Sequence, residues 1–196
     1  MKLFDVAVSP EEVLNHPRHQ ACQTTLAELI AQLRACENVK DGYEFQNDLL
    51  MHRLAVDADR NAFSRAVKRM KHGERPQADA PEPQSGLALG SLETWHLELD
   101  ICERVGRQLR CVGDALAWRV FGFERRYILA LCRNEPPGVM AGKAGLAAER
   151  ARVDQAWKED GKFAILHDLT NCLRIGDVTV FGDGPPETIE INLDLS

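Results

Sequence analysis

The sequence lacks three features that would assign a class of protein at once. Its six cysteines form no Cys-x-x-Cys pair, which argues against a zinc site or a disulfide framework. No apolar run is long enough to cross a bilayer, and the first residues, MKLFDVAVSPEE, contain no apolar leader segment. Basic residues are not in excess, because the formal net charge is −6. We therefore expect a cytoplasmic protein with reduced thiols and no membrane partner, in which only a local groove could be basic.

The composition is that of a globular protein, with 44% hydrophobic and 28% charged residues. Apolar spacing predicts helices over residues 22–36, 45–55 and 58–71. The stretch GERPQADAPEPQSGLALG is rich in Pro, Gly and polar residues, as linkers are. The sequence therefore divides into a helical region over 1–72, a linker or long loop over 73–90, and a second region over 91–196.

The second region begins helical and ends in strands. Apolar stripes predict helices over 92–112 and 115–121, separated by Gly113-Asp114, and a further helix over 145–158. Residues 123–132 fit helical and alternating patterns alike, and we favour a helix. Short β-branched or aromatic runs predict strands over 163–166, 177–181 and 188–193, of which the last two flank a Gly- and Pro-rich turn and should pair antiparallel. The expected fold class is α+β.

Three acidic residues fall on consecutive predicted elements of this region. Glu149 lies four residues after Gly145 on a helix, Asp177 opens a strand, and Glu190 lies inside the next strand. Period-2 alternation places Glu190 and Asn192 on one face of that strand, opposite its isoleucines. An acid on an otherwise apolar strand needs a partner or a cation. Converging carboxylates can hold Mg²⁺ or Mn²⁺ for phosphodiester hydrolysis.

These residues resemble the motifs of the PD-(D/E)XK, restriction-endonuclease-like superfamily. The similar segment runs from about 143 to 192 and contains Gly-x-x-x-Glu on a helix, an Asp on the second strand and Glu-x-Asn on the third. The resemblance implies a nuclease core, with Asp177 and Glu190 as metal ligands and the Ile191 carbonyl as a further ligand. Glu149 would be an auxiliary acid.

Two departures from the superfamily pattern affect this expectation. Asn192 stands where the superfamily has a lysine, and an amide cannot carry its positive charge. Lys143 or Lys162 could supply the missing cation from another position. The sequence ends at Ser196, without the last helix and strand of the core, so we expect an exposed sheet edge that a second copy or another protein could cover.

Several polar residues near the acids have a functional and a structural interpretation. Arg174 and Lys143 are candidates for binding phosphate, and Arg174 is equally well explained as a structural residue. For Asp168 we favour a structural role at a turn, where Thr170 would also bond the backbone. Arg104, Arg107 and Arg110 recur along one helix flank, where solvated charge is favoured over a substrate groove. Asp114 is expected to cap a helix.

The leading hypothesis is a metal-dependent nuclease-like protein that hydrolyses phosphodiester bonds in DNA or RNA. Glu149, Asp177, Glu190 and Asn192 would form its catalytic site, with Mg²⁺ or Mn²⁺ as cofactor. The alternative is an inactive module of the same fold that binds a protein or nucleic-acid partner. In a third possibility, the hairpin is merely structural and the acids do not converge.

Overall fold

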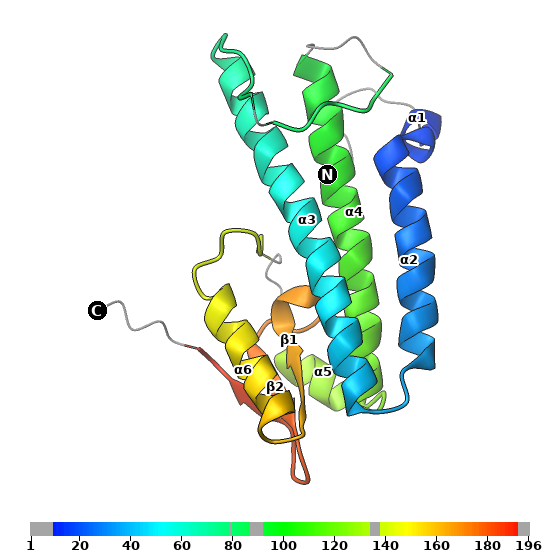
Figure 1. Cartoon of the computed structure of the whole chain (residues 1–196), viewed down its shortest axis with the longest axis vertical. Helices are drawn as coiled ribbons and strands as arrows, with labels where there is room; N and C mark the ends of the chain where they lie inside the picture. The colour runs from blue at the N-terminus through cyan, green and yellow to red at the C-terminus, as the bar shows by residue number, and fades with distance from the viewer. Residues whose placement is uncertain (1–9, 79, 87–91, 134–137, 192–196) are drawn as a thin grey trace, which may run out of the picture.

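The protein is α+β, with long helices beside a small antiparallel sheet (Figure 1). The computed structural model describes residues 10–78, 80–86, 92–133 and 138–191. Asn192, which was predicted to belong to the catalytic site, lies outside the described residues. The elements in chain order are α1 (Pro10–Asn15), α2 (Pro17–Ala35), α3 (Val39–Lys71), α4 (Leu92–Val120), α5 (Arg125–Leu131), α6 (Leu146–Lys158), β1 (Phe163–Leu166), the 3-10 turn η1 (His167–Leu169), β2 (Val178–Phe181) and β3 (Glu187–Ile189).

Helices α2, α3 and α4 lie side by side and form the helical part of the molecule (Figure 1). Asn38 caps the start of α3, where its side chain accepts a hydrogen bond from the Asp41 amide at 3.0 Å. Two helices were predicted over 45–55 and 58–71, but α3 is continuous. The junction contains no Gly or Pro, and Asp57 makes an ion pair with Arg53 one turn earlier.

Helix α4 also continues where a break was predicted. Gly113 lies within α4. A glycine is needed there because the backbone of η1 packs directly against it, and a Cβ would lie 2.0 Å from the Leu169 carbonyl oxygen. Asp114 caps no helix start. Its Oδ1 instead accepts from the amides of Asn171 at 2.6 Å and Cys172 at 2.9 Å. Both residues that suggested a helix boundary therefore serve contacts with the segment after β1.

The sheet has the strand order β1-β2-β3, and both neighbouring pairs are antiparallel. Phe163 lies opposite Phe181, and Val178 lies opposite Ile189. The predicted hairpin is therefore confirmed, although β3 is shorter than expected. Helix α6 packs on β1 and β2, and α3 contacts β1, so the sheet is held between helices (Figure 1).

One hydrophobic cluster joins the helices and the sheet. It includes Phe45 from α3, Ile101 from α4 and Ile165 from β1, all fully buried. Residues before and after the segment 73–90 therefore share a core. Cys22, Cys36 and Cys102 are buried as expected for free thiols, whereas Cys111 and Cys132 are exposed. None of the helices in the described ranges is long and apolar enough to span a membrane.

The outer edge of β1 is satisfied by a side chain from α3. The Gln46 amide nitrogen donates to the Ala164 carbonyl at 2.9 Å, and its oxygen accepts from the Leu166 amide at 2.9 Å. Gln46 is 1% exposed, so both bonds form without competing water. This side chain thus takes the place of a neighbouring strand for two backbone groups.

Replacing Gln46 tests how strongly this contact holds the sheet to the helices. We expect Gln46→Leu to lower the free energy of unfolding by about 2–5 kcal/mol, because two buried backbone groups lose their partners. Urea denaturation measures the change. Gln20→Leu on the exposed side of α2 is the control and should change little. Equal stability of the two variants would contradict the assignment.

Candidate functional site

The ammonium group of Lys143 lies among three carboxylates at one end of the sheet. Its Nζ is 2.6 Å from Glu149 Oε1, 2.7 Å from Asp168 Oδ2 and 3.5 Å from Asp177 Oδ1. The Lys143 side chain is 32% exposed, so solvent reaches the cluster from one side. We call this group of four residues the acid–lysine site. Its acids are Glu149 in α6, Asp168 in η1 and Asp177 directly before β2.

Local structure explains why these four side chains meet. Lys143 lies in a turn before α6, where its amide donates to the Met140 carbonyl at 3.0 Å. Glu149 lies in the first turn of α6, where a carboxylate is favoured by the helix dipole. Asp168 lies in η1, directly after β1. The chain therefore brings together one residue of α6 and three residues of the connections around it in one small αβββ unit.

Asp177, which directly precedes β2, is fixed by residues at the end of the hairpin. Its amide donates to the Ile189 carbonyl at 2.9 Å, and its Oδ2 accepts from the Ile191 amide at 2.8 Å. The preceding Gly176 has φ +72°, and a Cβ there would lie 2.6 Å from Thr188 Cγ2. Glycine meets both requirements. Asp177 therefore presents one oxygen to Lys143 while the other oxygen ties β2 to the end of β3.

The electrostatics of the site are unbalanced, because one ammonium faces three carboxylates. Burial would lower the pKa of Lys143, but hydrogen bonds to Asp168 and Glu149 outweigh it and raise that pKa. The pKa of Glu149 is raised by burial, against the opposing effect of Lys143, and Asp177 and Asp168 raise it further. Lys143 therefore stays protonated, whereas burial disfavours the ionised form of Glu149.

Glu149 also contains a polar atom without a partner. The residue is 2% exposed, and its Oε2 is buried with no hydrogen-bond donor in reach among the described residues. A buried carboxylate oxygen normally has a partner, because leaving it unpaired is costly. The site therefore contains an unsatisfied acceptor and more carboxylates than cations.

A line of hydrogen bonds connects the core to β3 next to the acids. His167 Nε2 lies 2.7 Å from Thr179 Oγ1, which lies 2.9 Å from Thr188 Oγ1. Burial lowers the pKa of His167 to about 4, so the imidazole is neutral at pH 7. His167 therefore acts as a structural hydrogen-bonding group beside the site.

The structure brings together some predicted site residues and separates others. Glu149, Asp177 and Lys143 converge, whereas the Glu190 side chain is exposed although its neighbours Ile189 and Ile191 both bond to Asp177. Arg174 donates to the carbonyl oxygens of His167 at 3.5 Å and Leu173 at 2.8 Å, and also to that of Thr170. Its guanidinium is therefore engaged with the backbone around η1.

Asp168 is the member of the site that sequence reasoning weighed mainly as a turn residue. Thr170 does fulfil that role, since its hydroxyl donates to the His167 carbonyl at 2.9 Å. The available signal was the position of Asp168 immediately after a buried strand. Of the two lysines considered as substitutes, Lys143 is at the acids, and Lys162 packs beside Gly182 near the hairpin turn.

The acids fit a divalent metal in their chemistry and charge, but their arrangement in the structure does not form a metal site. Oxygen ligands suit Mg²⁺, and the three carboxylates leave two negative charges after Lys143 is counted. Within residues 10–78, 80–86, 92–133 and 138–191, however, no group of three or more His, Cys, Asp or Glu is arranged to hold a metal ion. The ammonium group occupies the centre between the acids.

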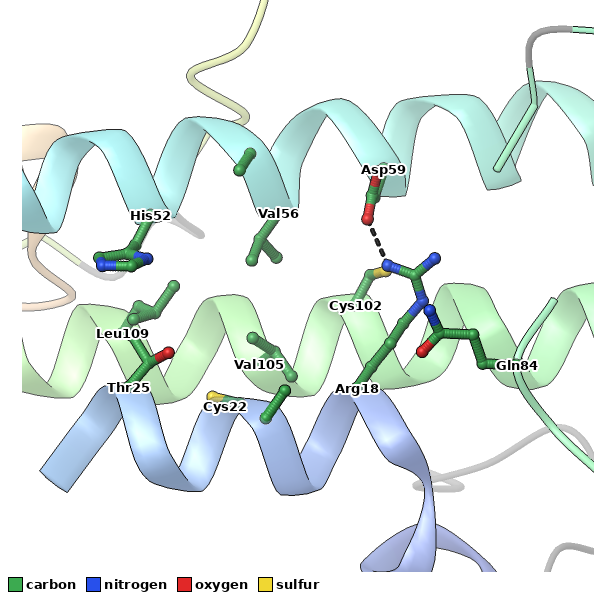
Figure 2. A pocket seen from close by; sticks show the side chains of 12 residues that line it. Arg18, Cys22, Thr25, His52, Val56, Asp59, Gln84, Cys102, Val105 and Leu109 are labelled. Atoms are coloured by element: carbon green, nitrogen blue, oxygen red, sulfur yellow. Dashed lines mark hydrogen bonds and ion pairs between the residues drawn. The ribbon is translucent and has the colours of Figure 1, made fainter. Parts of the chain in front are cut away.

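A separate cavity of about 280 Å³ lies between α2, α3 and α4 (Figure 2). Its charged wall is Arg18, which pairs with Asp59 and donates to Glu98 Oε2 at 2.9 Å. Cys22, Val56 and Leu109 line the apolar part. The charged groups of this cavity already have partners, so it offers less chemistry than the acid–lysine site.

Comparison with family models, with curated proteins and with solved structures finds no match for this chain. The case for its function therefore depends on the site geometry.

Removing the Lys143 charge should make stability depend more steeply on pH. In Lys143→Met, burial and the neighbouring acids raise the pKa of Glu149 without opposition, so the folded state retains a proton that the unfolded state releases above about pH 4.3. The free energy of unfolding should then fall as the pH rises from 5 to 8, by about 1.4 kcal/mol for each unit of added pKa shift.

Urea denaturation at pH 5 and pH 8 measures this effect, with the native sequence as reference. The double variant Lys143→Met/Glu149→Gln is the matched control and should recover a flatter pH profile. Parallel profiles for the native protein and Lys143→Met would show that the ammonium does not stabilise the buried carboxylate.

Proposed function

We propose that this chain is a nuclease-like protein that hydrolyses phosphodiester bonds in DNA or RNA with a divalent metal. The observation that carries the proposal is the convergence of Glu149, Asp168 and Asp177 on the Nζ of Lys143. The acids come from a helix, a turn and the start of a strand, and two of them, Glu149 and Asp177, are motif positions of the superfamily that the sequence resembles. That resemblance itself remains part of the proposal.

Lys143 supplies the cationic group that Asn192 cannot. A lysine next to acidic groups can stabilise the negative charge that develops on a phosphate during hydrolysis, and it can position a water molecule. Its raised pKa keeps it protonated at pH 7, so its role is electrostatic. Acid or base chemistry would fall to Glu149, whose pKa is raised.

Asp177 and Asp168 would hold the metal, and the free Oε2 of Glu149 could join them. Mg²⁺ or Mn²⁺ would supply charge neutralisation and activation of water. Binding requires that the Lys143 ammonium withdraw from the centre of the acids, and its partly exposed side chain leaves a path for that movement. Glu190, which was predicted as a ligand, would have to turn in from its exposed position.

Cleavage assays with matched variants test the proposal. The substrates are linear and supercoiled DNA, single-stranded DNA and RNA, each with Mg²⁺ or Mn²⁺. We expect Asp177→Asn to abolish cleavage and Lys143→Gln to reduce the rate about 10²–10³-fold, as loss of a charge-stabilising group does. The control is Asp183→Asn, which neutralises an exposed acid in the hairpin turn.

The competing candidate is a non-catalytic binding module of the same fold. It is favoured by the Lys143 ammonium, which already compensates part of the acidic charge, and by the short edge strand β3, to which a partner could add. Cleavage that is absent with every substrate, in the native chain and in Asn192→Lys alike, would reject the nuclease and leave this candidate.

A further inference from the structure

A second pocket, of about 260 Å³, lies between α3 and α4 and is lined by arginines. Arg53 and Arg60 come from α3, Arg107 and Arg110 come from α4, and the backbone at Gly138 closes one side. Glu103 also lines the pocket and pairs with Arg60 at 2.9 Å. We call it the arginine pocket. Its walls are therefore predominantly cationic, in a protein whose net charge is negative.

Arg53 is buried in this pocket with unused hydrogen-bond donors. The residue is 3% exposed, and its Nε and Nη1 have no hydrogen-bond partner among the residues that the structure describes. Its Nη2 lies 2.5 Å from Asp57 Oδ1. A buried guanidinium with unpaired N–H groups is costly unless acceptor oxygens reach it. The missing partner is therefore an anion or a strong acceptor.

Gly106 on α4 is the residue that leaves space for this guanidinium. A Cβ at position 106 would lie 2.7 Å from Arg53 Nη1 and 3.1 Å from Arg53 Cζ. Any other residue would push the Arg53 head away from α4. Since glycine in the interior of a helix costs about 1 kcal/mol relative to alanine, its presence needs a reason, and the Arg53 position supplies one.

Arg110 and Arg107 differ in how many of their donors already have partners. Arg110 is fixed, because it donates to the Gly138 carbonyl and, at 3.4 Å, to the Asp168 carbonyl. Arg107 is exposed at the pocket and forms no ion pair with any residue in the described ranges. The pocket thus has one buried and one accessible arginine with donors to spare.

We propose that the arginine pocket binds a phosphoryl group. A tetrahedral oxyanion presents several acceptor oxygens, one of which can accept from an unpaired N–H of Arg53 while others accept from the fork of Arg107. Arg110 connects this pocket to the acid–lysine site, because it bonds the backbone of Asp168. The phosphoryl group of a nucleic acid end is the source that fits the proposed nuclease, on which this part of the inference rests. A free phosphorylated small molecule shares the same chemistry.

Titration calorimetry at low ionic strength, with inorganic phosphate as the probe, tests the pocket. We expect phosphate to bind the native chain and to raise its melting temperature. Arg107→Gln should weaken binding at least about tenfold, as loss of a charge-assisted hydrogen bond does. Gly106→Ala should weaken it as well, by displacing Arg53. The control Arg125→Gln removes an exposed arginine from α5 and should bind like the native chain.

Two oligonucleotides then identify the source of the phosphoryl group. Tighter binding of a 5′-phosphorylated strand than of its 5′-hydroxyl counterpart, with the preference lost in Arg107→Gln, assigns the pocket to a nucleic acid end. Phosphate binding without such a preference assigns it to a small phosphorylated ligand. Both results support the pocket.

The proposal is overturned if phosphate does not bind, or if Arg125→Gln weakens binding as much as Arg107→Gln does. The folded state of each variant is checked by circular dichroism, and Arg107→Gln changes only an exposed side chain. Asp177→Asn should retain phosphate binding while it loses cleavage. Failure of the arginine pocket is therefore distinguishable from failure of the nuclease proposal.

Discussion

The buried carboxylate of Asp57 is the constraint on which the arrangement of the sites depends. It has no exposure and must find partners inside the protein, and it finds them in the Arg53 guanidinium and in the Met140 amide, 2.7 Å from its Oδ2. A lone buried charge would be strongly destabilising, so both contacts are needed. The first fixes the direction of Arg53 within α3. The second fixes the segment that leads to Lys143, and so places the ammonium among the acids.

The two sites share a physical theme, because in each the opposing charges are unequal. Three carboxylates share Lys143, while the arginine pocket has more guanidinium groups than carboxylates. Arg110 lies between them and bonds the backbone of Asp168, so the excesses of opposite sign are adjacent. In the proposed nuclease, cationic groups would contact the backbone of the substrate and the acids would lie at the bond that breaks. The adjacent excesses of opposite charge are consistent with that proposal.

Local sequence patterns predicted the elements well and the long-range contacts poorly. The run Phe163–Leu166 is apolar and short, and it forms the predicted strand with those bounds. The break at Gly113 was wrong because the glycine makes room for a distant backbone, which no local pattern reveals. The convergence of Asp177 and Glu149 was anticipated from element order. The roles of Asp168 and Gln46 depend on contacts far along the chain and could not be inferred from propensity.

Gln46 makes the two edges of the sheet differ in their ability to accept another strand. Its amide bonds two backbone groups at the outer edge of β1, so of the two edges of the sheet formed by the described strands, that of β3 is the one left for a further strand. Continuous fibres require two open edges on every copy, because each molecule must accept one neighbour and offer itself to the next. With one edge closed, two copies can meet through their β3 strands about a two-fold axis, and no third copy can follow. For the sheet of the described strands, strand addition would therefore stop at a pair.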